Sequence, residues 1–342
     1  MMRQSMDGQT RRSVLGGGLA LTLSARLTVA EPLAGWGGVR QSAAALDQLH
    51  ALIVSVDGET VLAENYRGPG LDRSVNVKSV SKTFVAALVG AAIDRGVIPG
   101  VDATIGEVAP SLIPSGADPA VDGITVADLL TMQAGLERTS GANYGSWVSS
   151  PNWIADALGR PMVSSPGERM AYSTGSYHVL GAVLSSASGR SLLALSRDWI
   201  GDPLGFDVPA WTRDPQGYYL GGNEMALSPR ALVRFGEMYR LRGAWGETRV
   251  LSAGWVGASF EPRTRSPFSG LDYGYGWFLG RAQGHRFALA RGYGGQVICV
   301  VPDLGMTVAI TSDPTQPARS GGYFGDLLDL IGDRIIPAAE MV

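Results

Sequence analysis

The amino-acid sequence predicts an α/β fold of the α+β type, in which helices flank one antiparallel sheet and a helical lobe is inserted into it. Strand-like runs lie at about residues 51–66, where Asp57-Gly58 interrupts them, and again between about residues 273 and 312. An Asp-Gly pair between two such runs is a strong hairpin signal. The region from about residue 98 to residue 265 carries helix signals instead. Strands at both ends around a helical middle are typical of one sheet built from distant segments, with a cleft beside the lobe.

The helix signals of the middle region are N-cap residues followed by apolar runs. They are Thr125 before Val126–Met132, Ser176 before a run that reaches Ser188, and Ser228-Pro229 before a run that reaches about Arg240. Beyond the C-terminal strands, an amphipathic pattern from about Tyr323 to Ile336 predicts a helix that closes the sheet.

The first 30 residues have the pattern of an export signal. Arg11-Arg12 precede the uncharged run 14–25, and Thr28-Val29-Ala30 offers small residues for cleavage. This run is too short to span a bilayer, so we expect no stable membrane span. The paired arginines indicate the twin-arginine route, with an ordinary secretory signal or an uncleaved tail as alternatives. Residues 31–342 are then one large domain of a periplasmic or secreted protein.

The composition excludes several classes of partner. The chain has a formal net charge of −3, and its leader carries four arginines against one aspartate, or +3, which leaves −6 on the remainder. An acidic chain without a basic run argues against nucleic acid as a partner. Cys299 is the sole cysteine, so an internal disulfide is impossible and we expect it to be buried filler. The sequence does not specify an oligomeric state.

The retained lysines point to chemistry. The chain has only two, Lys78 and Lys82, against 26 arginines, and Lys82 lies three residues after Ser79. Positions i and i+3 share one face of a helix, so the amine can reach the hydroxyl. A buried lysine can lose its proton and act as a base, which arginine cannot do. Ser-x-x-Lys is therefore the pattern of a serine nucleophile with its own base.

The helix that follows Ser79 strengthens this interpretation. Apolar residues surround it until it ends at Gly96, which is typical of a buried helix. Its first turn would place Ser79 and Lys82 in a low dielectric near the positive end of the helix dipole, which disfavours an ammonium ion and favours a developing alkoxide. Taken alone, Ser-x-x-Lys is a weak signal that also occurs in solvated surface pairs.

Two further segments carry candidate site residues. Tyr172 lies in a bend just before a predicted helix, where a phenol can relay a proton, although a packed tyrosine would look the same. The segment Arg291–Gln296 is rich in glycine and leads into a strand. Glycines beside a strand let a ligand approach backbone amides, as an oxyanion hole requires, although a tight turn would also need them.

Taken in this order, the three segments resemble the serine β-lactamase and penicillin-binding-protein superfamily, and most closely its class C-like branch, which includes esterases and 6-aminohexanoate-type amide hydrolases. The resemblance covers nearly all of residues 31–342 and implies a β-lactamase/transpeptidase-like fold. It implies Ser79 as the acylated nucleophile, Lys82 as the base or proton shuttle, and Tyr172 as the first residue of a Tyr-x-Asn box. It also implies that the backbone N–H groups of Ser79 and Gln296 form the oxyanion hole.

The sequence departs from the family pattern at two places. Thr174 stands where the Tyr-x-Asn box has an amide. Tyr293-Gly294-Gly295 stands where the third box begins with a cation that pairs with a substrate carboxylate, and Arg291 could partly compensate because it shares a strand face with Tyr293.

These four residues of the boxes are candidate substrate contacts, together with two residues of the predicted lobe. They are Thr174, Tyr293, Gly294 and Gly295, with Tyr144 and Asn223. Trp147 and Trp153 flank the same boxes. For Tyr144, Asn223 and these two tryptophans, plain packing is at least as strong an interpretation.

The sequence therefore predicts an exported serine hydrolase that acts through an acyl-enzyme on small esters or amides. The missing cation makes β-lactamase or D,D-peptidase activity the alternative. An alternative of another class is a non-catalytic penicillin-binding-like recognition module. The resemblance implies no metal and no organic cofactor, and the three histidines are far apart in sequence, without a partner at ligand spacing.

Overall fold

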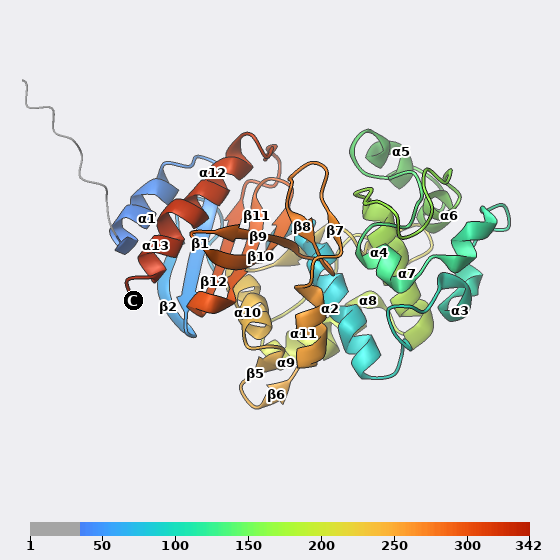
Figure 1. Ribbon diagram of the computed structural model, residues 1–342, viewed down its shortest axis with the longest axis horizontal. Helices are drawn as coiled ribbons and strands as arrows, with labels where there is room; N and C mark the ends of the chain where they lie inside the picture. Colours follow the sequence, from blue (N-terminus) through green and yellow to red (C-terminus); the bar gives the residue numbers. More distant parts are fainter. Residues whose placement is uncertain (1–34) are drawn as a thin grey trace, which may run out of the picture. The chain divides into compact units, whose positions relative to one another are not determined.

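The computed structural model describes residues 35–342, so the predicted export signal at residues 1–30 lies outside the described residues. Its main element is an antiparallel sheet of eight strands in the order β2-β1-β12-β11-β10-β9-β8-β7 (Figure 1). The strands of this sheet are β1 (Leu49–Val56), β2 (Glu59–Asn65), β7 (Thr264–Arg265), β8 (Asp272–Tyr273), β9 (Phe278–Ala282), β10 (His285–Gly292), β11 (Gln296–Val301) and β12 (Met306–Ser312). The prediction of one antiparallel sheet built from both ends of the chain is confirmed.

Two short ladders and the helices complete the fold. The ladders pair β3 (Val75–Lys78) with β4 (Met225–Leu227), and β5 (Ala244–Trp245) with β6 (Thr248–Arg249). The helices are α1 (Gly35–Ala44), α2 (Val80–Asp94), α3 (Ile105–Val108), α4 (Val126–Leu130), α5 (Tyr144–Val148), α6 (Trp153–Leu158), α7 (Thr174–Ser188), α8 (Leu192–Ser196), α9 (Asp202–Leu204), α10 (Pro229–Arg240), α11 (Ala253–Ser259), α12 (Tyr323–Leu330) and α13 (Ile336–Ala339). No single helix within residues 35–342 is both long and apolar enough to cross a membrane.

Helices cover the sheet on both faces. Helices α1, α12 and α13 lie against one another over one face, and α10 packs on β1, β11 and β12 from the other (Figure 1). The helices α3 to α7 form the lobe beside the sheet. Helix α10 is amphipathic, and a methyl group on Gly236 would lie only 2.5 Å from Thr307 Cγ2 of β12, which shows how closely the helix approaches the strand.

The lobe is shorter than the sequence predicts. We expected it to run from about residue 98 to residue 265, but α10 lies inside that range and packs on the sheet, and β7 is already a strand of the sheet. The physical reason is that an amphipathic helix shows that it has a buried face without showing which partner buries it. The strands likewise begin at residue 49 and resume at residue 264, slightly outside the expected limits.

Helix α2 is the buried connection between the sheet and the lobe. Every residue from Val80 to Ala92 is buried, and the helix contacts both α7 and strands β10 and β11. It begins directly after Ser79, and Gly96 follows its end with a φ of 68°, a left-handed conformation that glycine adopts without strain. The sequence of α2 therefore fixes Ser79 at the point where sheet and lobe meet.

Candidate active site

Ser79 and Lys82 face each other on the first turn of α2. Lys82 Nζ lies 3.0 Å from Ser79 Oγ, within hydrogen-bond distance. Lys82 Nζ also donates to the backbone carbonyl oxygen of Gly222 at 2.6 Å and to Thr174 Oγ1 at 3.2 Å. A neutral amine has two N–H groups and one lone pair. With both N–H groups used by Gly222 and Thr174, the lone pair is left for the Ser79 hydroxyl.

Burial makes this amine a base near neutral pH. Lys82 is 2% exposed and has no acidic partner among the described residues. Desolvation lowers the pKa of Lys82 from 10.5 to about 7, because the charged ammonium form loses more hydration on burial than the neutral amine. At neutral pH a large fraction of the molecules therefore carries an amine that can accept a proton.

Tyr172 is the third predicted site residue, and it lies beside the pair. Lys82 Nζ is 4.9 Å from the centre of the Tyr172 ring. Burial raises the pKa of Tyr172, while contact with the Ser79 hydroxyl and the positive charge of Arg291 lower it to a smaller extent. The phenol thus keeps its proton at neutral pH, and it is suited to donate a proton rather than to remove one.

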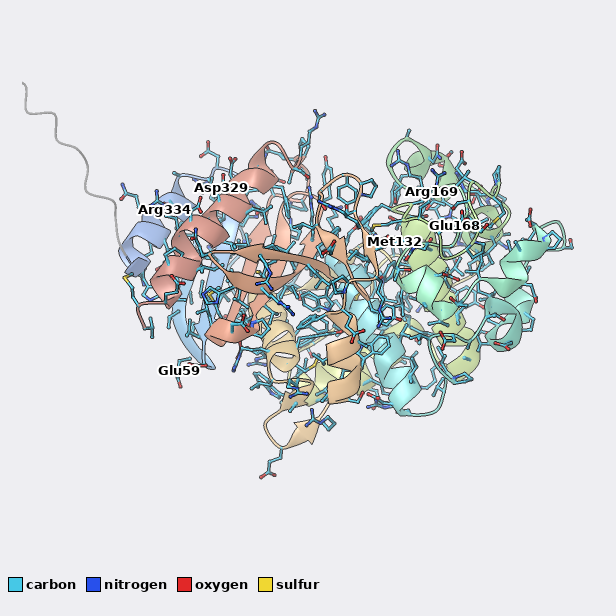
Figure 2. All side chains as sticks on the ribbon, in the orientation of Figure 1. Glu59, Met132, Glu168, Arg169, Asp329 and Arg334 are labelled. Atoms are coloured by element: carbon cyan, nitrogen blue, oxygen red, sulfur yellow. The ribbon has the colours of Figure 1, made fainter. Side chains whose placement is uncertain are left out.

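The backbone of the lobe holds the segment around Tyr172 in place. Met132 follows α4. Its backbone carbonyl oxygen accepts a hydrogen bond from the Ala171 N–H at 2.9 Å, and its sulfur accepts one from the Ser173 N–H at 3.4 Å. Figure 2 shows Met132 in the lobe near Glu168 and Arg169, which begin this segment.

Ser140 supports Thr174 and was not predicted from the sequence. Its hydroxyl lies 2.9 Å from Thr174 Oγ1 and accepts a hydrogen bond from the Thr174 N–H at 2.8 Å. Thr174 is the first residue of α7, which begins two residues earlier than the expected N-cap Ser176. The hydroxyl at the third position of the box thus contacts Lys82 on one side and Ser140 on the other.

The end of β10 brings backbone groups to the nucleophile. Gly292 lies directly against Val77 of β3, and a Cβ atom at position 292 would collide with the Val77 carbonyl oxygen. The next residue, Tyr293, lines the cavity beside Ser79 and is 53% exposed. Only glycine at position 292 lets the strand come this close.

The other predicted residues of this segment turn away from the cavity, which corrects the sequence prediction. Gly292 pairs with Gln296 in the β10–β11 ladder, so residues 293–295 form a tight turn. A Cβ atom on Gly294 would meet the Asp313 backbone, and one on Gly295 would meet the Tyr323 ring. Gln296 is fully buried, and its side-chain amide donates to the Ser312 carbonyl oxygen at 2.8 Å. None of the three lines the cavity.

A cavity of about 560 Å³ opens beside Ser79. Its aromatic lining residues are Tyr144, Tyr172, Phe268, Phe278 and Tyr293, and its charged ones are Lys78, Arg138, Glu224 and Arg291. Thr174 and Asn223 also line it, and Asn223 Nδ2 donates to Tyr144 Oη at 3.1 Å. Tyr144, Thr174, Asn223 and Tyr293 therefore lie where the sequence analysis placed them. Trp147 and Trp153 do not, because they pack against the buried His178.

Arg291 places a positive charge at the cavity, and its guanidinium is fixed by neighbouring groups. Its guanidinium donates to Ser320 Oγ at 3.1 Å and to the Ala318 carbonyl oxygen at 3.0 Å, and it stacks 3.5 Å from the Phe324 ring centre. Burial lowers the pKa of Arg291 to about 10, so the side chain is still charged at neutral pH. Its contacts among the described residues are to neutral groups, which leaves the charge available to an anion.

Comparison with known proteins identifies the family. The family model described as Beta-lactamase matches residues 43–330, which is most of the chain. The chain belongs to this β-lactamase family. A search of the curated proteins finds no match.

Solved structures of this family's fold are similar to the chain at low sequence identity. The hydrolase EstCE1, described as having promiscuous acyltransferase activity, has a TM-score of 0.72 and 18% identity over 86% of this chain and 97% of its own. A D-stereospecific amidohydrolase from Streptomyces sp. has a TM-score of 0.66 and 18% identity over 85% and 96%. A penicillin-binding-protein homologue from Caulobacter crescentus has a TM-score of 0.64 and 17% identity over 80% and 90%. At these identities the likenesses show the fold alone.

Proposed function

We propose that the protein is a serine hydrolase that forms an acyl-enzyme on Ser79 and acts on small esters or amides. The observation that carries this proposal is the buried amine of Lys82, 3.0 Å from Ser79 Oγ, with both of its other hydrogen-bonding directions occupied. A hydroxyl in this position becomes a nucleophile when the amine takes its proton.

The two chemical steps follow from the positions of these groups. In acylation, Ser79 Oγ attacks the carbonyl carbon of the substrate while its proton moves to Lys82 Nζ. Tyr172 gives its proton to the leaving alcohol or amine and regains one from the Lys82 ammonium. In deacylation, water attacks the acyl carbon and gives a proton to Lys82 Nζ. The bond between the acyl carbon and Ser79 Oγ then breaks, the acid leaves, and the Lys82 ammonium returns the proton to Ser79 Oγ.

The negative charge on the substrate oxygen needs two N–H donors. The Ser79 N–H at the start of α2 is one of them, as the resemblance implies. For the other we propose the Tyr293 N–H instead of that of Gln296. Support comes from Gly292, which brings the end of β10 against the strand that leads into Ser79, and from the position of Tyr293 on the cavity wall.

The cavity favours a small substrate with apolar parts. Five aromatic side chains surround a volume of about 560 Å³, which suits a compact ester or amide. β-Lactamase or D,D-peptidase activity is the weaker alternative, because the third box has Tyr293 in place of its usual cation. The export signal at residues 1–30 and export to the periplasm or outside the cell stay predictions.

A labelling experiment tests the proposal. Purified wild-type protein is incubated with a fluorophosphonate probe and assayed on p-nitrophenyl esters, an anilide and nitrocefin. We expect labelling and ester turnover that disappear in Ser79→Ala and persist in Ser188→Ala, whose hydroxyl contacts backbone groups of Leu184 and Arg190 at the end of α7. A wild-type protein that binds these compounds but neither labels nor turns them over would instead support the non-catalytic recognition module.

A further inference from the structure

The second lysine of the chain forms a closed polar network at the edge of the cavity. Lys78 Nζ lies 3.0 Å from Glu224 Oε1, and Asn76 Nδ2 donates to Glu224 Oε2 at 2.6 Å. The Lys78 N–H donates to Asn76 Oδ1 at 2.9 Å, which closes the ring. Both carboxylate oxygens of Glu224 are thereby used. The two charged side chains are 20% and 27% exposed, so solvent screens the pair only in part.

Both charged residues have an unusual backbone conformation. Lys78 has a φ of 51° and Glu224 a φ of 68°, in the left-handed region that costs free energy for residues other than glycine. Such strained residues persist when their surroundings hold them, and they cluster at functional sites. Here each strained residue is held by the side chain of the other.

Ser81 makes a second link between the same two segments. Its hydroxyl donates to the Lys78 carbonyl oxygen at 2.6 Å and accepts a hydrogen bond from the Met225 N–H at 3.2 Å. Ser81 is fully buried on α2, and residues 78 and 225 are partners in the β3–β4 ladder. The two links together join the segment before α2 to the segment before β4.

The joined segments carry two of the three hydrogen-bond partners of the Lys82 amine. Lys78 is the residue before Ser79, and Glu224 is two residues after Gly222, whose carbonyl oxygen accepts from Lys82 at 2.6 Å. Gly222 is confined on its other side as well, because a Cβ atom there would lie 2.7 Å from the Thr174 carbonyl oxygen. A small movement of the segment around Glu224 would therefore change the contacts of Lys82.

We propose that Asn76, Lys78 and Glu224 form a positioning clasp, which holds the Gly222 carbonyl group and Ser79 at the distances that the Lys82 amine requires. The clasp acts through Ser79 and Lys82 and does not itself react with substrate. This proposal rests on the proposed hydrolase function, so its test includes a measurement that does not depend on turnover.

The kinetic test is a double-mutant cycle with Lys78→Met and Glu224→Gln. A loosened clasp misplaces the reacting groups, so each single variant should lose about 10- to 100-fold in kcat with KM changed by less than about threefold. The double variant should be no slower than the slower single variant, because either change opens the same link. Glu64→Gln is the matched control: it breaks the Arg40–Glu64 pair outside the cavity and should leave both constants unchanged.

The outcomes separate positioning from substrate contact. A rise in KM with unchanged kcat would mean that the pair contacts substrate and would overturn the clasp. Additive losses in the double variant would overturn it as well, since two independent contributions would then be at work.

The second measurement uses the fact that the chain has only two lysines. Protein labelled with ¹³C at lysine Cε should give two resonances, which Lys78→Met assigns. Asn76→Ala opens the clasp without changing any charge. We expect the Lys82 resonance to move and its titration midpoint to rise, because water reaches the amine, while Glu64→Gln leaves both in place. Tyr172, whose ring centre lies 4.9 Å from the Lys82 amine, is unchanged in all variants.

This measurement distinguishes failure of the clasp from failure of the hydrolase proposal. An unchanged Lys82 resonance in folded Asn76→Ala overturns the clasp, whether or not the wild type is active. The Lys82 resonance could shift in Asn76→Ala while the wild type shows no turnover. This result would support the clasp as a structural link and remove the hydrolase function that it was proposed to serve.

Discussion

Replacing Lys82 with methionine should make the protein more stable at neutral pH and should change how its stability depends on pH. Methionine has a similar length and no charge, so Lys82→Met removes the cost of burying an ammonium ion. It also leaves the Gly222 carbonyl oxygen and Thr174 Oγ1 without their donor, which is a loss that does not depend on pH.

The size of the pH effect follows from the pKa of Lys82. The value falls from 10.5 in the unfolded chain to about 7 in the folded protein. At about 1.4 kcal/mol for each pKa unit, the buried ammonium costs on the order of 5 kcal/mol when both states are protonated, below about pH 7. Between about pH 7 and pH 10.5 the unfolded chain binds more protons than the folded protein, so the free energy of unfolding rises with pH. Lys82→Met lacks this contribution.

Urea unfolding at several pH values measures the difference between wild type and Lys82→Met. Other titrating groups are common to both proteins and cancel in the difference. We expect the free energy of unfolding of wild type, relative to the variant, to increase by about 1.4 kcal/mol per pH unit between about pH 7.5 and pH 9.5. A constant difference over this range would show that Lys82 keeps an ordinary pKa, and the assignment of Lys82 as the base would fall with it.

Three further predictions concern activity. The kcat/KM of wild type should rise through about pH 7 as Lys82 loses its proton, and Lys82→Arg should be inactive at every pH; activity in that variant would contradict the base role. Gly292→Ala should lower kcat at least ~10-fold and destabilise the protein by about 1–3 kcal/mol, because the new methyl group meets the Val77 carbonyl oxygen. Gly257→Ala is the control, because a methyl group there lies in open space on α11; it should leave activity intact and stabilise the protein by up to ~1 kcal/mol. If thermal melts show the same change in stability for Gly292→Ala and Gly257→Ala, the packing argument is refuted. Arg291→Met should raise KM about 5- to 10-fold for esters that bear a carboxylate and less than about twofold for neutral esters, and equal changes would exclude Arg291 as an anion contact.

The contact between Ser79 and Lys82 could be predicted from the sequence because it depends on one helix. The spacing of three residues lets the amine reach the hydroxyl, and the apolar residues around the helix indicate that the amine is buried, as the structure has them. The sheet could be predicted because strand-like runs gather at the two ends of the chain.

Contacts between distant segments could not be predicted in the same way. Gly222 and Ser140 reach the site only because the lobe folds onto α2, and neither belongs to a pattern that periodicity can find. Gln296 was placed in the oxyanion hole because the family resemblance implied it. The register that pairs Gly292 with Gln296 ends β10 at the cavity and directs the turn toward α12. Register depends on both strands together, so one segment read alone cannot fix it.

The neighbours of β1 have a consequence for how the chain acquires its structure. This strand pairs with β2, which follows it directly, and with β12, so that Leu49 lies opposite Ser312. On a ribosome, the second hydrogen-bonding edge of β1 stays unpaired until β12, more than 240 residues later in the chain, has emerged. Any shorter nascent chain presents an open, apolar β-edge, the kind of surface that chaperones protect and that otherwise aggregates. Completion of the sheet, and with it of the site at the end of β10, is therefore a late and long-range event in folding.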